Sequence, residues 1–178
     1  MKLVFATHNP NKLKEVQQMV PDHIELINLE TIGCTTNIPE TANTLEGNAK
    51  IKADFVTNTY QLSCFADDTG LLVEALDGEP GVYSARYAGE ACSYDDNNQK
   101  LLKALENIPT EQRGARFVCC AAFVGTDSSK HIEVGTVDGI IAPHCKGDQG
   151  FGYDPVFIPE WYEHQSCSIA WPCNNELY

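Results

Sequence analysis

Two adjacent carboxylates, Asp67 and Asp68, are the residues whose types and spacing point most directly to chemistry in this sequence. They follow an apolar run over 62–66 and precede Thr69 and Gly70. Neighbouring carboxylates repel each other, and desolvation at the end of a buried strand raises the cost of their charges. A divalent metal would offset both costs. Oxygen ligands beside a hydroxyl suit Mg²⁺, which usually arrives with substrate phosphates.

The same four residues also have a purely structural interpretation. Asp accepts hydrogen bonds from its own backbone, and Gly tolerates a positive φ. Taken alone, the segment from Asp67 to Gly70 therefore favours a solvated hairpin turn. The rest of the chain has to decide between a turn and a site.

Hydrophobic periodicity predicts the elements that position this segment. Strands are expected over 2–6, 25–29, 62–66, 71–75, 114–126, 131–142 and 156–158, and helices over 11–20, 44–60 and 93–106. Thr41 or Asn43 is expected to cap the second helix, and Ser93 with Asp96 forms a capping-box pattern before the third. Strands and helices are mixed, with one long hairpin, which favours an α/β (α+β) fold with a mixed sheet.

Composition limits the class of protein. A chain of 178 residues predicts a single domain with a sizeable core. The net charge of −13 argues against nucleic acid as a partner, because a duplex binder needs a basic footprint. No apolar run is long enough to cross a membrane and no signal peptide precedes the first strand, so a cytoplasmic location is expected. The eight cysteines lack Cys-x-x-Cys spacing, which disfavours a structural zinc site.

Two N-terminal segments carry residue types that suit phosphate or metal. A polar turn lies between the first strand and the first helix, where N–H groups at the helix N-terminus attract phosphate; it contains Thr7, His8, Asn9, Pro10, Asn11 and Lys12. Further along, Glu40 is a candidate metal partner, and Lys52 shares a helix face with Asn48. Taken singly, these segments are equally consistent with an ordinary helix cap, a loop carboxylate and a solvated lysine face.

Two later segments suit a nucleotide. Arg86 lies between Tyr83 and Tyr87. Its guanidinium can stack on an aromatic ring or form a bidentate contact with an anion. In the glycine-rich stretch 150–155, Phe151 can stack on a base and Asp154 can accept hydrogen bonds from it. Their structural alternatives are a loop held by aromatic rings and a tight turn before a strand.

In this order, the segments resemble the inosine triphosphate pyrophosphatase (Ham1-like) family. The matching motifs are Thr7-x-Asn9-x-x-Lys12, Glu40-Thr41 with Thr44 and Asn48-Ala49-x-x-Lys52-Ala53, Ala66-Asp67-Asp68-Thr69-Gly70-Leu71, Pro80-Gly81-Val82-Tyr83-Ser84-Ala85-Arg86-Tyr87, and Phe151-Gly152-Tyr153-Asp154-Pro155-Val156-Phe157. The likeness covers residues 1 to about 160 of one domain, 1–178. It implies an elongated, twisted mixed sheet flanked by helices, with two lobes around a central nucleotide cleft.

The family hydrolyses damaged purine nucleoside triphosphates (ITP, dITP and XTP) to the monophosphate and pyrophosphate with Mg²⁺. The resemblance implies the same activity here, in a homodimer. It implies that Asp68 is the general base and a metal partner and that Glu40 is a second metal partner. Asp67 is expected to be structural or to support the metal ligands indirectly. The substrate-binding residues that it implies are Thr7, His8, Asn9, Pro10, Asn11, Lys12, Lys52, Thr69, Arg86, Phe151, Gly152, Tyr153 and Asp154. Thr69 replaces the family's more usual Ser and keeps its hydroxyl.

The C-terminal stretch departs from the family pattern. No Lys or Arg follows Lys146, and residues 161–178 lack the Ser-His-Arg motif with which the family reads the base. Such a tail is expected of a shortened or frame-shifted terminus. It supports an alternative function, a nucleotide-binding homologue with weakened or unselective catalysis. A cysteine-based redox or metal protein is a third hypothesis.

Overall fold

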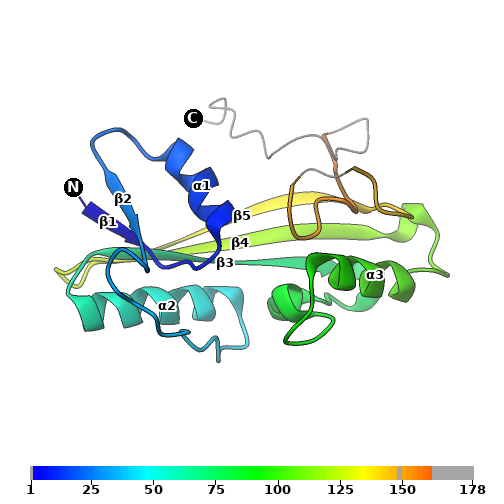
Figure 1. Ribbon diagram of the computed structural model, residues 1–178. Coiled ribbons are helices and arrows are strands. Elements are labelled where there is room, and N and C mark those ends of the chain that lie inside the picture. Colours follow the sequence, from blue (N-terminus) through cyan, green and yellow to red (C-terminus); the bar gives the residue numbers. More distant parts are fainter. Residues whose placement is uncertain (1, 148–149, 162–178) are drawn as a thin grey trace. The chain divides into compact units, whose positions relative to one another are not determined.

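The computed structural model describes residues 2–147 and 150–161 (Figure 1). The chain divides into two compact units, each built from two stretches of sequence. Unit 1 comprises Met1–Asp68 and Cys119–Gly135, and unit 2 comprises Thr69–Val118 and Thr136–Tyr178. The boundary falls directly after Asp68, so the acidic pair belongs to unit 1 and Thr69 to unit 2.

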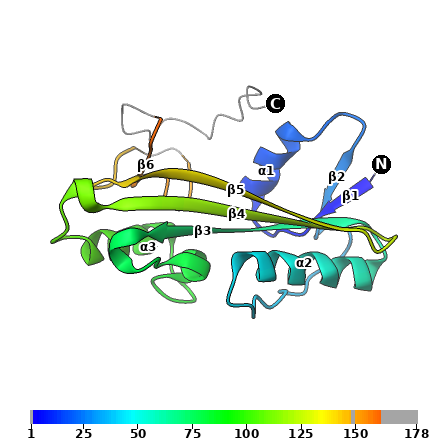
Figure 2. The same ribbon diagram turned by 180° about the vertical axis from the view of Figure 1, so that it is seen from behind.

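Six strands form one mixed sheet in the order β2-β1-β3-β4-β5-β6 (Figures 1 and 2). β1 pairs in parallel with both β2 and β3, whereas β6 pairs antiparallel with β5. The predicted mixed sheet is therefore confirmed. The strand bounds are Lys2–Phe5 for β1, Glu25–Asn28 for β2, Cys64–Val73 for β3, Gly114–Val124 for β4, Lys130–Ile141 for β5 and Phe157–Pro159 for β6.

The two long helices of unit 1 begin at side-chain caps. α1 spans Pro10–Met19 and follows Asn9, and its first residue is a proline, whose fixed φ suits that position. α2 spans Leu45–Tyr60 and follows Thr44, whose hydroxyl accepts a hydrogen bond from Gly47 N at 3.0 Å. The prediction that Thr41 or Asn43 caps α2 is wrong. The N–H group of Gly47 in the first turn needs a partner, and the residue three positions before it is Thr44.

α2 buries one face in unit 1. Leu45, Ala49, Ala53 and Val56 recur at helical spacing and are each less than a tenth exposed. α1 and α2 lie on opposite faces of the sheet (Figures 1 and 2). Each face of β3 in unit 1 therefore has its own helix from which a side chain can reach it.

Unit 2 contains α3, Tyr94–Ala104, and its own apolar core. The predicted capping box is confirmed: Asp96 N donates to Ser93 Oγ at 3.1 Å, and Ser93 N donates to Asp96 Oδ2 at 2.7 Å. The core joins β3 and α3 to the end of the described chain through Leu71, Val73, Leu101, Leu105, Ile141, Val156 and Phe157. Short 3₁₀ helices span Glu74–Leu76, Gly81–Arg86 and Thr110–Gln112.

The acidic segment lies inside a strand. β3 runs without a break from Cys64 to Val73, so the prediction of two strands over 62–66 and 71–75 separated by a turn is wrong. Cys64, Ala66, Asp68 and Gly70 are buried, and the residues between them are not, which is the period of two expected of a strand. Within unit 1, a lysine forms an ion pair with each carboxylate of the acidic pair. The charges of Asp67 and Asp68 therefore do not require a solvated turn.

The described cysteines are all free thiols, and Cys64 and Cys120 are buried as small apolar side chains. Among the described residues, no helix has the length and apolar character needed to cross a membrane.

Candidate active site

A lysine from α2 joins two carboxylates in unit 1. Lys52 Nζ lies 2.9 Å from Glu40 Oε1 and 3.4 Å from Asp68 Oδ1. Glu40 comes from the segment before α2, and Asp68 comes from β3. Three separate pieces of chain thus bring one cation and two anions together; we call this group the Glu40–Lys52–Asp68 cluster.

Asp67 has a different partner. Its carboxylate forms an ion pair with Lys12, which α1 supplies. Alternation along β3 points Asp67 and Asp68 to opposite faces of the sheet, where α1 and α2 lie. Each carboxylate of the acidic pair therefore has its own lysine, and only Asp68 belongs to the cluster with Glu40.

Burial shapes the protonation of the cluster. Asp68 is 9% exposed, and desolvation raises its pKa, while the Lys52 charge opposes that rise and the Glu40 charge adds to it. Burial also acts to lower the pKa of Lys52, but Asp68 and Glu40 outweigh it, so the Lys52 pKa is raised. Asp68 is consequently a stronger proton acceptor than an ordinary aspartate, and Lys52 keeps its charge.

The donor atoms of the cluster fit a hard divalent cation. Asp68 Oδ2 is buried and makes no hydrogen bond within the described part of the chain. Across residues 2–147 and 150–161, no group of three or more His, Cys, Asp or Glu side chains is placed to hold a metal ion. Two carboxylates suit Mg²⁺, which is commonly held by one or two carboxylates, waters and substrate phosphates and not by an all-protein cage.

The turn before α1 is held by its own side chains. Thr7 Oγ1 accepts from Asn9 N at 3.0 Å, and Asn9 Oδ1 accepts from Asn11 N at 2.9 Å and from Lys12 N at 3.4 Å. His8 Nε2 lies 3.4 Å from Thr36 O. The Asn9 cap uses the N–H groups of Asn11 and Lys12, which are among those expected to attract phosphate. An anion here must displace Asn9 or bind the side chains.

In unit 2, a 3₁₀ helix carries Arg86. The guanidinium lies 3.7 Å from Glu90 Oε1 and 5.3 Å from the ring centre of the exposed Tyr83. Ser84, in the same helix, accepts from Leu71 N at 2.9 Å and donates to Gly81 O at 2.6 Å. The bond from Leu71 N fixes the Arg86 segment to β3, the strand in which Thr69 is half-buried.

The 151–154 turn is fixed from two sides in unit 2. Tyr153 is buried and donates its hydroxyl to Ser84 O at 2.9 Å, and burial raises its pKa. Asn98 Nδ2, from α3, donates to Gly152 O at 2.9 Å. Within the turn, Phe151 N donates to Asp154 Oδ2 at 2.8 Å. The half-buried Phe151 ring is therefore presented by a rigid segment, whereas Tyr153 is part of the core.

Comparison with known proteins is consistent with this arrangement. The family model described as the Ham1 family matches residues 3–170. The chain belongs to the Ham1 family. A dITP/XTP pyrophosphatase of Porphyromonas gingivalis is 54% identical over 176 residues, 99% of this chain and 90% of the relative. A dITP/XTP pyrophosphatase of Flavobacterium johnsoniae is 52% identical over 177 residues, 99% of this chain and 91% of the relative.

Solved Ham1 structures have the same fold. The Ham1 protein of Staphylococcus aureus gives a TM-score of 0.79 at 39% identity, with 88% of this chain and 80% of that chain covered. A HAM1 protein from Coxiella burnetii gives a TM-score of 0.80 at 37% identity, with 88% and 81% covered. The predicted α/β fold is confirmed, and the names of the relatives agree with the activity that the motifs predict.

Three buried asparagines of this Ham1 family member are not among the predicted site residues. Asn48, Asn97 and Asn98 are all at most 3% exposed. Asn97 accepts from Ala88 N at 2.7 Å and donates to Ala85 O at 3.2 Å, so it holds the segment around Arg86. The available signals were the spacing of Asn48 to Lys52 and the position of the Asn97-Asn98 pair just after the capping box.

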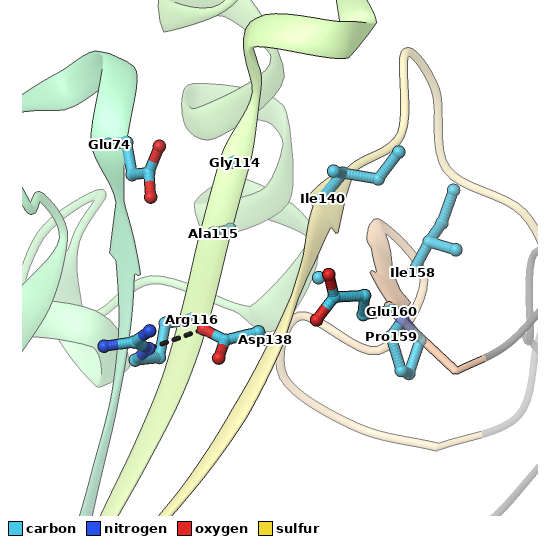
Figure 3. A pocket seen from close by; sticks show the side chains of 10 residues that line it. Glu74, Gly114, Ala115, Arg116, Asp138, Ile140, Ile158, Pro159 and Glu160 are labelled. Atoms are coloured by element: carbon cyan, nitrogen blue, oxygen red, sulfur yellow. Dashed lines mark hydrogen bonds and ion pairs between the residues drawn. The ribbon is translucent and has the colours of Figure 1, made fainter.

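None of the predicted site residues of this Ham1 family member lines a surface cavity of unit 2. This cavity measures about 490 Å³ and contains the ion pair between Arg116 and Asp138, whose atoms are 2.5 Å apart (Figure 3). Glu74 and Glu160 also line it. Carboxylates outnumber cations there, so the cavity repels a triphosphate.

Proposed function

We propose that this chain hydrolyses dITP, XTP and ITP to the nucleoside monophosphate and pyrophosphate with the help of Mg²⁺. The observation that carries the proposal is the Glu40–Lys52–Asp68 cluster, in which Lys52 Nζ lies within hydrogen-bonding distance of both acids. The names of the Ham1 relatives, dITP/XTP pyrophosphatases, supply the substrate class. The resemblance also supports a homodimer in the cytoplasm.

The proposed chemistry assigns Asp68 the role of general base. Its raised pKa suits it to accept a proton from the water that attacks the α-phosphorus. Glu40 and Asp68 would hold Mg²⁺, which when bound neutralises phosphate charge and stabilises the leaving pyrophosphate. Lys52 adds a positive charge for the phosphates, and Asp67 keeps Lys12 in place.

The remaining predicted residues are proposed to bind the nucleotide. Thr7 to Lys12 would contact the phosphates and sugar, and the hydroxyl of Thr69 and the guanidinium of Arg86 would contact the anion. Phe151 would stack on the base, and Asp154 would accept from it. The buried Tyr153 hydroxyl, bound to Ser84 O, supports an indirect role in holding this turn.

The proposal is tested by incubating the protein with dITP and Mg²⁺ and measuring pyrophosphate and dIMP. We expect release at a rate far above that of an Asp68→Asn variant. Release no faster than that variant would overturn the proposed function for this chain.

The alternative, unselective or weak catalysis, rests on the absence of Lys and Arg after Lys146. Most of the atypical tail, residues 162–178, lies outside the described residues. A panel of dITP, XTP and dATP separates the two hypotheses. Faster hydrolysis of dITP and XTP than of dATP supports the proposed function, and equally slow hydrolysis of all three supports the alternative.

A further inference from the structure

Asn48 is a fully buried polar residue on α2, one helical turn before Lys52. Its side chain is 0% exposed, and its Oδ1 accepts a hydrogen bond from Ala42 N at 2.9 Å. Ala42 follows Glu40 by two residues. The Asn48 side chain therefore fixes the segment that carries Glu40 to the helix that carries Lys52.

Gly47 supports the same contact from the next helix position. A Cβ at Gly47 would lie 2.6 Å from Ala42 Cβ and 2.9 Å from Thr44 Oγ1. Both distances are shorter than a Cβ atom allows between non-bonded atoms. The absence of a side chain at Gly47 therefore lets the 42–44 segment lie close to α2. Two adjacent helix residues thus set where the Glu40 segment lies, one by leaving space and one by a hydrogen bond.

The Nδ2 end of the Asn48 amide and one oxygen of the Asp68 carboxylate lack a hydrogen bond in the described part of the chain. The atoms concerned, Asn48 Nδ2 and Asp68 Oδ2, are both buried. Asn48 lies one helical turn before Lys52 on the same face of α2, and Lys52 Nζ lies 3.4 Å from Asp68 Oδ1, so the Asn48 amide faces the Asp68 carboxylate. An unpaired buried donor and an unpaired buried acceptor in one cluster are each costly unless they meet or bind a ligand.

We propose that Asn48 is a positioning residue that holds the Glu40 segment through Oδ1 and orients the Asp68 carboxylate through Nδ2. The two acids are thereby preorganised for one divalent cation. The inference rests on the proposed function and deepens it, because it explains how two sequence-distant carboxylates are kept ready for Mg²⁺. Residues that orient metal ligands typically change metal affinity or activity by 10- to 100-fold when they are replaced.

The test measures metal binding without nucleotide, using Mn²⁺ followed by electron paramagnetic resonance. We expect Asn48→Ala to raise the Mn²⁺ dissociation constant by about tenfold or more. Hydrolysis of dITP should fall at low Mg²⁺ and recover in part at high Mg²⁺, which general damage to the fold would not produce. The matched control is Asn58→Ala, on an exposed position of the same helix, and should bind Mn²⁺ as the wild type does.

Gly47→Ala is an independent test that leaves Asn48 and Asp68 unchanged. Its new Cβ pushes the Ala42 segment away, so Mn²⁺ affinity should fall although alanine favours the helix. This variant decides the matter if Asn48→Ala does not fold. Mn²⁺ dissociation constants within twofold of wild type in the folded variants would overturn the proposal, as would no Mn²⁺ binding by the wild type.

The two proposals fail in different ways. A wild type that binds Mn²⁺ but does not hydrolyse dITP contradicts the proposed function, and the Mn²⁺ comparison still decides the role of Asn48. A wild type that hydrolyses dITP beside an Asn48→Ala variant with unchanged Mn²⁺ affinity contradicts only the role of Asn48.

Discussion

Lys52 Nζ lies 3.4 Å from Asp68 Oδ1, so the proposed general base has a positive partner within the chain itself. The same ammonium lies 2.9 Å from Glu40. One lysine therefore partly neutralises both carboxylates that are proposed to hold Mg²⁺. A divalent cation held by these carboxylates would compete with Lys52 for the same oxygens, and a bound triphosphate would offer Lys52 a new partner.

The first prediction concerns this competition. Lys52→Met should bind Mn²⁺ more tightly than wild type in the absence of nucleotide, because the competing charge is gone. Its dITP hydrolysis should nevertheless fall by about 100-fold, because a cation that stabilises the transition state is lost. Lys50→Met, at an exposed position of the same helix, is the control and should change neither quantity. Weaker Mn²⁺ binding by Lys52→Met would contradict the competition.

The second prediction separates the acidic pair. Asp68→Asn should lower kcat for dITP by about 100-fold or more, because an amide cannot accept the proton from water. Asp67→Asn should act mainly on KM, since it releases Lys12 and leaves the Glu40–Lys52–Asp68 cluster intact. Steady-state pyrophosphate release measures both constants. Equal losses of kcat in the two variants would show that the opposite faces of β3 do not separate their roles.

The ends of the helices could be predicted from local sequence, whereas the centre of β3 could not. α3 begins where the Ser93 and Asp96 pattern places it, because a cap depends only on neighbouring residues. The acidic segment carries local turn chemistry, but its partners are distant: Lys12 is 55 residues from Asp67, and Lys52 is 16 residues from Asp68. Those ion pairs let the strand continue through both carboxylates.

The charged residues of the candidate site could be predicted from local motifs, whereas the buried amide beside them could not. Charged motifs indicated Glu40, Lys52 and Asp68, and these three lie together. The spacing of Asn48 to Lys52 places both residues on one helix face, but it does not indicate that Asn48 is buried, because an asparagine at that spacing can face solvent or a neighbouring segment. Its partner, Ala42 N, is a backbone group and has no signature of its own.

The third prediction concerns pH and the start of α3. The Ser93 hydroxyl and backbone N–H lower the pKa of Asp96 by hydrogen bonding to its charged form. A folded-state pKa below the unfolded value of about 3.9 stabilises the fold fully above that pH, and the stabilisation is lost as pH falls through the lower folded value. Ser93→Ala removes the N-cap hydroxyl of α3 and should cost about 1 kcal/mol of unfolding free energy at pH 7.

Urea unfolding of wild type and Ser93→Ala at pH 7 and pH 3 measures this effect. The difference between the two proteins should be smaller at pH 3, because this pH lies below the unfolded pKa of about 3.9 and the stabilisation from the Asp96 charge is then being lost. Asp95→Asn is the control, since Asp95 lies in the same turn outside the capping box. A difference that stays the same at both pH values would contradict the role of the Asp96 charge.

The fourth prediction concerns the link between the two segments of unit 2 that are proposed to bind the nucleotide. Tyr153→Phe removes the hydroxyl that donates to Ser84 O at 2.9 Å, which should lower the unfolding free energy by about 1 kcal/mol. Because Tyr153 adjoins Phe151 and Ser84 lies two residues before Arg86, the variant should also raise KM for dITP and narrow the preference for dITP over dATP. Tyr94→Phe, which changes an exposed ring of the same unit, is the control. A loss of stability with an unchanged dITP-to-dATP ratio would mean that the Tyr153 bond serves the core alone, and that base selection does not depend on how tightly the 151–154 turn is held.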